Sequence, residues 1–219
     1  MSAMIDAAAG YGFPAEIALV ASDQAEAAGL ELAARRRIAA RAVARAEFAG
    51  REAHEAALDR VLREHDIELL CLAGYMRLLS PDFVTRWSGR AINIHPSLLP
   101  LFPGLDTHRR ALEAGVRIHG ASVHFVTGET DAGPIIAQAA VPVHPSDDET
   151  TLGERVLAAE HRLYPLALRL VAEGLAKLEA GKAVLAGTEG ERHSDDTVLI
   201  SPLATSKPVD LEQLARITP

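Results

Sequence analysis

An asparagine and a histidine stand two residues apart at the end of an apolar run. Residues 90–95 are predicted to form a strand, so Asn93 and His95 project from the same face. Pro96 lacks the N–H that a strand ladder needs, so the strand should stop there. An amide donor beside an imidazole suits acyl or formyl transfer, with Asn93 stabilising an oxyanion and His95 donating to it or moving protons. The alternative is that Asn93 caps a turn and His95 bonds a local carbonyl, and spacing alone favours that alternative.

A carboxylate follows in the Gly-flanked loop 126–134. Asp131 could approach His95 and stabilise its imidazolium form. It could equally be a solvated turn aspartate, which is the commoner role of Asp next to Gly. His124, on the preceding extended stretch, is an auxiliary candidate whose alternative is plain packing in the core. A lone Cys71 inside an apolar run is predicted to be a small buried hydrophobe and not a nucleophile.

The elements that must position these residues alternate between strands and helices. Three apolar runs are predicted to be buried strands: 16–21, 67–73 and 90–95. Apolar residues at helical spacing predict a helix over 51–64. This alternation indicates an α/β fold with a Rossmann-like, mainly parallel sheet flanked by helices.

Beyond Gly120 the pattern changes. Residues 121–126 and 134–143 are predicted to be antiparallel strands, and a long helix is expected over 151–173. We therefore expect one domain over 1–174 with a C-terminal antiparallel extension. Residues 175–219 are predicted to be a tail made of a weak β pair and a loop.

Composition narrows the function classes. The formal net charge of −8 argues against a nucleic-acid partner, which needs a concentrated basic face. The single cysteine allows no disulfide within the chain, so a cytoplasmic setting is expected. No apolar run reaches membrane-spanning length, and no Cys or His pair has zinc spacing, so neither a membrane nor a metal partner is expected.

Four runs together closely resemble the folate-dependent formyltransferases, and within them the enzymes that formylate glycinamide ribonucleotide. They are Asn-Ile-His-Pro-Ser-Leu-Leu-Pro at 93–100, Phe-Pro-Gly-Leu at 102–105, His-Gly-Ala-Ser-Val-His-Phe-Val at 119–126 and Asp-Ala-Gly-Pro-Ile-Ile at 131–136. Relatives that formylate methionyl-tRNA usually follow Ser-Leu-Leu-Pro with an Arg-Gly pair, whereas this chain has Phe-Pro-Gly. The resemblance extends to about Gly174 and implies transfer of a formyl group from 10-formyltetrahydrofolate to the amine of glycinamide ribonucleotide.

The resemblance also implies roles for individual residues. Asn93 and His95 match the oxyanion and proton-handling pair, and Asp131 matches the carboxylate that tunes the histidine. Glu160 matches a contact to the nucleotide substrate, and the Leu99–Pro100 peptide is expected to be cis. The implied folate-binding residues are Arg51, Met76, Arg77, Leu78, Leu79, Asn93, Val126, Thr127, Glu129 and Thr130. Without the resemblance, Arg51 and Glu160 would be assigned to solvated helix positions. The expected partners are the two small-molecule substrates, and the expected state is a monomer or weak homodimer.

Three departures from the family accompany the resemblance. The family begins with a strand and a phosphate-holding loop, whereas residues 1–8 resemble the helix that follows them. We therefore expect the first strand and phosphate loop to be absent, through a late start or a truncation, which would expose strand edges. Asp106 and Leu157 stand where other polar residues are expected. Two rival functions remain: formylation of another amine such as methionyl-tRNA, and folate binding with impaired activity.

Overall fold

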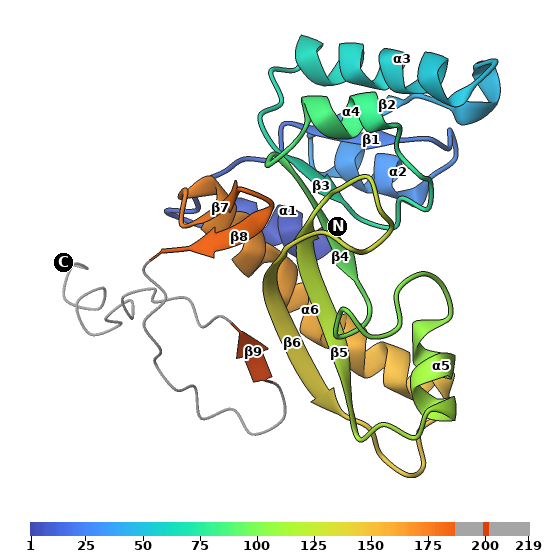
Figure 1. Ribbon diagram of the computed structural model, residues 1–219. Coiled ribbons are helices and arrows are strands. Elements are labelled where there is room, and N and C mark those ends of the chain that lie inside the picture. Colours follow the sequence, from blue (N-terminus) through green and yellow to red (C-terminus); the bar gives the residue numbers. More distant parts are fainter. Residues whose placement is uncertain (187–198, 202–219) are drawn as a thin grey trace.

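Helices and strands alternate along the first half of the chain in the order that the apolar runs predict. The structure is a computed structural model that describes residues 1–186 and 199–201 (Figure 1). The helices are α1 (Ser2–Ala8), α2 (Ala28–Arg35), the 3-10 turn η1 (Arg45–Glu47), α3 (Arg51–Glu64), α4 (Pro81–Arg86), α5 (Thr107–Glu113) and α6 (Glu149–Ala172). The strands are β1 (Leu19–Ser22), β2 (Ala39–Ala42), β3 (Leu70–Leu72), β4 (Ala91–His95), β5 (Ile118–Phe125), β6 (Ile135–Pro142), β7 (Ala176–Glu179), β8 (Lys182–Leu185) and β9 (Leu199–Ser201).

Parallel pairs come first along the chain and antiparallel pairs follow. β1 pairs with β2 and β3 with β4, both parallel. β5 is antiparallel to β4 and to β6, and β9 adds antiparallel to β6, which gives the order β3-β4-β5-β6-β9. The predicted α/β class with helix-flanked parallel strands and an antiparallel extension is confirmed. The β7–β8 hairpin matches the weak β pair predicted after residue 174, whereas the loop predicted beyond it falls largely outside the described residues.

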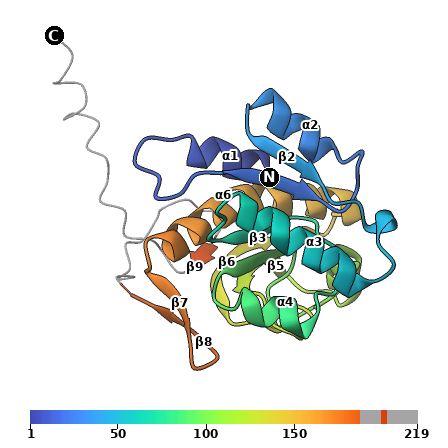
Figure 2. The same cartoon turned by 90° about the horizontal axis from the view of Figure 1, so that it is seen from above.

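Helices cover both faces of the strands. Figure 2 shows α1, α2 and α6 on one face and α3 and α4 on the other. α6 begins at a capping box in which the Asp148 carboxylate accepts from the Thr151 N–H. Its buried residues include Leu152, Val156 and Leu163, which belong to the main hydrophobic core with β5 and β6. Burying each such side chain contributes about 2 kcal/mol, so α6 is a rigid support for these two strands.

Helix α3 has the predicted bounds but a polar buried face. Its buried residues are His54, Glu55, Asp59 and Leu62, whereas Ala53 and Ala56, which carry the predicted apolar spacing, are exposed. The buried polar groups are hydrogen-bonded: His54 Nε2 lies 2.8 Å from the Val43 carbonyl. Hydrogen bonding to specific partners, together with the packing of Leu58 and Leu62 against β3 and α4, therefore orients this helix.

A cavity of about 640 Å³ separates β1 from β3. Residues of both strands line it, together with side chains from α1 and α3. Within the described part of the chain, β1 and β3 belong to different sheets and each has one hydrogen-bonded neighbour. β3 is shorter than the run 67–73 that predicts it, and β1 begins at Leu19 instead of residue 16 and ends at Ser22. Among the described residues, no helix is long and apolar enough to cross a membrane.

Candidate active site

The pairing of β4 with β5 brings the predicted residues of the two strands together. Asn93 stands opposite His124, and His95 stands opposite Ser122. The Asn93 amide nitrogen lies 3.3 Å from His124 Nε2. As the spacing predicts, β4 ends at His95, and Asn93 is partly exposed whereas His95 is 5% exposed. The amide and the imidazole thus stand at the end of a strand that is buried up to that point.

His95 is held through both ring nitrogens. Nδ1 lies 3.3 Å from an Asp131 carboxylate oxygen, and Nε2 lies 3.0 Å from the Phe102 carbonyl. Both partners are acceptors, so the doubly protonated ring satisfies both contacts. The predicted approach of Asp131 to His95 is confirmed, and His95 is placed to carry and release a proton.

Asp131 is fixed by the loop that carries it. Its backbone lies in the left-handed region with φ 52°. The carboxylate oxygen near His95 also accepts from the Gly104 N–H at 2.8 Å, and the other oxygen lies 3.7 Å from His124 Nε2. The alternative of a solvated turn aspartate is therefore wrong for this residue.

The neutral form of His124 orients the Asn93 amide. Burial lowers the pKa of His124, against the opposing effects of the Phe125 carbonyl and the Asp131 carboxylate. His124 Nδ1 lies 2.9 Å from the Phe125 carbonyl and must donate to it, which leaves Nε2 as an acceptor for the Asn93 N–H. Among the residues that the structure describes, the second N–H of the Asn93 amide has no partner, so it can donate to an oxyanion.

Gly133 allows the Asp131 loop to lie against β5. A Cβ at this position would stand 1.7 Å from the Phe125 carbonyl oxygen and 2.9 Å from His124 Nδ1. The same close approach lets the Phe125 N–H donate to the Pro134 carbonyl at 2.9 Å. Any larger residue must push the loop away from the strand that carries His124.

Sequence reasoning missed a hydrogen-bond network beneath the 96–102 loop. The Ser122 hydroxyl donates to the Ser97 carbonyl at 2.7 Å and accepts from the Leu99 N–H at 2.9 Å. Gln138 on β6 donates to the Leu99 carbonyl at 3.0 Å and contacts the Ser122 hydroxyl at 2.9 Å. The expected cis peptide between Leu99 and Pro100 is confirmed. This network fixes the loop whose Phe102 carbonyl meets His95.

A second histidine pair lies beside this loop. His108 Nδ1 and His119 Nε2 are 3.2 Å apart, and the His119 ring meets the Phe102 ring edge-on at 5.9 Å. Burial lowers the pKa of His119 to about 4, with the nearby His108 and His95 acting in the same direction. His119 is therefore neutral at pH 7 and supports the loop without adding charge.

Tyr164 on α6 fixes the ends of β3 and β4. Its hydroxyl lies 2.7 Å from the Leu72 carbonyl and 3.1 Å from the Ile92 carbonyl. Burial raises the pKa of the neighbouring Cys71 thiol to about 12, so the thiol stays protonated. This agrees with the interpretation of Cys71 as an unreactive residue, although the residue is only partly buried.

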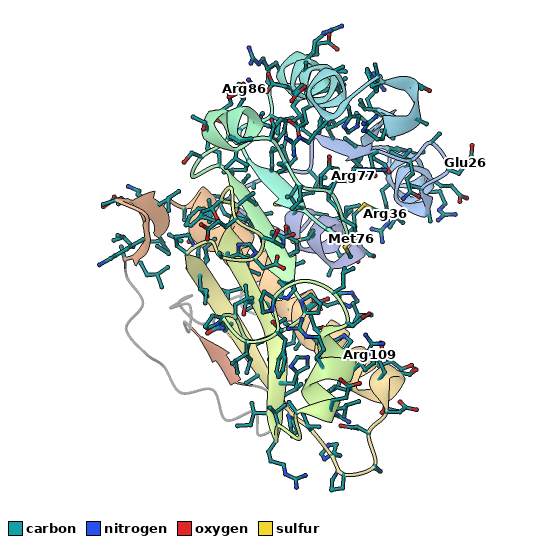
Figure 3. All side chains as sticks on the ribbon, turned by 45° about the vertical axis from the view of Figure 1, so that its right-hand side comes forward. Glu26, Arg36, Met76, Arg77, Arg86 and Arg109 are labelled. Atoms are coloured by element: carbon teal, nitrogen blue, oxygen red, sulfur yellow. The ribbon has the colours of Figure 1, made fainter. Side chains whose placement is uncertain are left out.

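The predicted folate-binding residues fall in two loops, on helix α3 and, in the case of Asn93, on strand β4. Met76 and Leu78 are 79% and 64% exposed. Arg77, which is labelled with Met76 in Figure 3, is ion-paired with Asp23. Val126 donates its N–H to the Ala91 carbonyl at 2.9 Å. The other predicted residues are partly buried Leu79 and Thr127, and exposed Arg51, Glu129 and Thr130. Their folate contacts remain predictions.

Glu160 lies on α6, and no hydrogen bond or ion pair among the described residues joins it to Asn93 or His95. It is partly buried, which raises its pKa to about 7, while the charge of the N-terminal amine acts in the opposite direction. Asp106 precedes α5 in the left-handed region and pairs with Arg109, and Leu157 is 48% exposed. Among residues 1–186 and 199–201, no group of three or more His, Cys, Asp or Glu side chains could hold a metal ion.

Comparisons with known proteins agree with this arrangement. Residues 1–168 match the family model described as formyl transferase. The phosphoribosylglycinamide formyltransferase of Escherichia coli is 44% identical over 187 residues, which cover 85% of this chain and 88% of that protein. The trifunctional purine biosynthetic protein adenosine-3 of Gallus gallus is 52% identical over 169 residues, which cover 77% of this chain but 17% of that protein. The chain thus spans a small part of its trifunctional relatives.

Solved structures show the same fold. Glycinamide ribonucleotide transformylase 1 from Symbiobacterium toebii matches with a TM-score of 0.81 at 46% identity, covering 84% of this chain and 87% of that chain. The phosphoribosylglycinamide formyltransferase from Brucella melitensis matches with a TM-score of 0.76 at 54% identity, covering 85% and 92%. The matched family model, these identities and the shared fold lead to one conclusion: the chain belongs to the formyl transferase family of enzymes.

Proposed function

We propose that this protein transfers the formyl group of 10-formyltetrahydrofolate to the amine of glycinamide ribonucleotide, a step of purine synthesis. One observation carries the proposal: Asn93, His95, Asp131 and His124 converge at the end of β4 with their polar groups oriented toward one another. The Escherichia coli relative and the two solved structures described above are matched over 87% or more of their own length. All three are named as glycinamide ribonucleotide formyltransferases or transformylases.

The geometry fits the chemistry of formyl transfer. The substrate amine attacks the formyl carbon, a new C–N bond forms, and the carbonyl oxygen gains negative charge. The free N–H of Asn93 and the protonated ring of His95 stabilise that charge. The C–N10 bond then breaks as His95 Nε2 leaves the Phe102 carbonyl and gives its proton to N10, and the attacking amine returns one proton to the ring. Asp131 keeps the imidazole oriented and balances its positive charge.

The segment 74–79 supports a folate pocket. Its main-chain groups form no hydrogen bond with the main chain of the other described residues, so they are available to the donors and acceptors of a pterin ring. The exposed Met76 and Leu78 side chains offer apolar contact to the same flat ring. The chain therefore has both the polar and the apolar groups that such a co-substrate needs.

The test is the rate at which formylglycinamide ribonucleotide forms, followed by chromatography with both substrates present. His95→Ala and Asp131→Asn are expected to lower kcat by about 100- to 10,000-fold, because each removes part of the proton-handling group. Affinity for tetrahydrofolate should change little. Either variant at the parent rate would contradict the assigned roles. Formylation of methionyl-tRNA in place of the ribonucleotide would instead overturn the substrate.

A further inference from the structure

The segment 74–79, which we propose to contact folate, forms no hydrogen bond with the main chain of other residues in the described part of the structure. It leaves β3 after Leu72 and enters α4 at Pro81, and its most exposed side chains are apolar. A segment without a main-chain ladder needs other contacts to keep one shape. Two carboxylates from distant parts of the chain supply them, one on α3 and one directly after β1.

The first carboxylate is Glu55 on α3, which is 2% exposed. It accepts from the Ser80 N–H at 2.8 Å and, through its other oxygen, from the Ser80 hydroxyl. Ser80 is also the N-cap of α4, where its hydroxyl oxygen accepts from the Phe83 N–H at 3.3 Å. Glu55 thereby fixes the point at which the segment meets α4.

The second carboxylate is Asp23, directly after β1. It forms an ion pair with the Arg77 guanidinium, in the middle of the segment. Tyr75 lies near both carboxylates: burial raises the pKa of its hydroxyl to about 12, and the charges of Asp23 and Glu55 act in the same direction. The two contacts thus hold the segment at its middle and at its end.

Stability alone does not account for Glu55. No ion pair balances its charge among the described residues, and a buried charge is costly unless it is well hydrogen-bonded. Replacing such groups by apolar residues of similar size is often neutral or stabilising. A carboxylate supplies two acceptors for the N–H and the hydroxyl of Ser80, which an apolar side chain cannot do.

We infer that Glu55 and Asp23 are positioning residues that hold the segment 74–79 in the shape that recognises the folate co-substrate. The inference rests on the proposed function. Neither residue touches the reacting atoms: both act through Ser80 and Arg77. Their loss should therefore weaken folate binding selectively and leave nucleotide binding and the chemical step largely intact.

The experiment compares Glu55→Gln and Asp23→Asn with a control on the same helix. Asp59, one turn after Glu55, also ties α3 to α4, because it accepts from Trp87 Nε1 at 3.0 Å, but it makes no contact with Ser80 or Arg77. Each test variant should raise the KM for 10-formyltetrahydrofolate about tenfold, the effect of one lost hydrogen bond to a charged group. The KM for glycinamide ribonucleotide and kcat should stay within about threefold of the parent values. Asp59→Asn should lower Tm without raising the folate KM.

A second pair of variants separates positioning from a folding defect. Ser80→Thr keeps the hydroxyl that Glu55 binds and should keep the folate KM, whereas Ser80→Ala should raise it. Asp23→Asn lies at a partly exposed pair, so it tests the inference even if Glu55→Gln does not fold. An unchanged folate KM in folded Asp23→Asn, or an equal rise in Asp59→Asn, would overturn the inference.

Direct titration with tetrahydrofolate distinguishes failure of this inference from failure of the proposed function. If the parent protein binds tetrahydrofolate and the variants bind it equally well, the positioning role is wrong. If the parent protein binds none, the proposed function itself is wrong, and the inference falls with it.

Discussion

Replacing Gly133 by alanine tests whether the placement of the Asp131 loop controls the rate. The added Cβ would stand 1.7 Å from the Phe125 carbonyl oxygen, and real Cβ atoms do not approach closer than 3.0 Å. The loop must therefore retreat by at least 1.3 Å, the difference between these distances. Asp131, two residues away, would leave the 3.3 Å contact with His95. A displacement of about 1 Å can lower a rate about 100-fold, which is the loss in kcat that we expect.

The assay is steady-state formylation, with thermal unfolding measured beside it. Crowding and loss of the bond between the Phe125 N–H and the Pro134 carbonyl should cost about 1–3 kcal/mol of stability. Gly128→Ala is the matched control for folding, because a Cβ at Gly128 meets nothing within 4 Å. It should leave Tm unchanged.

A double mutant decides whether the effect passes through Asp131. In an Asp131→Asn background, Gly133→Ala should lower kcat little further, since the contact that it displaces is already impaired. If the two losses multiply instead, or if folded Gly133→Ala has the parent rate, the loop does not act by holding Asp131 against His95 and the reasoning is refuted.

Three further predictions concern stability. The pKa of Glu160 is raised to about 7, so the folded protein binds a proton at this carboxyl more readily than the unfolded chain does. The free energy of unfolding should therefore fall as pH rises from 4.5 to 7. Glu160→Gln should remove that loss, about 3 kcal/mol, from urea unfolding curves at pH 8. The pKa of His119 is lowered to about 4, so stability should fall as pH drops from 6.5 toward 4, and His119→Asn should flatten this slope in the same curves. Ser122→Ala removes the hydroxyl that donates to the Ser97 carbonyl and accepts from the Leu99 N–H and the Gln138 amide. Chemical denaturation should show that the free energy of unfolding falls by about 1–3 kcal/mol.

The sequence predicts local features of the site well. The two-residue spacing places Asn93 and His95 on one face of β4, and Pro96 ends the strand, because both effects depend only on neighbouring residues. The convergence of Asp131 on His95 was open from the residues alone. The resemblance to the formyltransferases favoured it, and the structure confirms it.

Other features depend on contacts that no local pattern carries. Ser122 supports the active-site loop because an antiparallel register places it opposite His95 and Gln138, and register is a long-range property. The buried face of α3 is polar because Glu55 and Asp59 have partners on α4, so apolar spacing identifies the helix but not its buried side.

The separation of β1 from β3 has a consequence for isotope exchange in heavy water. In a parallel strand the N–H groups of successive residues point to alternate sides. Leu70 donates its N–H to the Arg90 carbonyl, so the N–H of Cys71 points away from β4 and into the cavity. In β1, the Ser22 carbonyl accepts from the Val43 N–H and so points toward the β2 side. By the same alternation, the N–H of Ala21 points away from β2 and toward the cavity. Deuterium should enter these two amides well before their neighbours in the same strands, so the exchange rates alternate residue by residue on both sides of the gap.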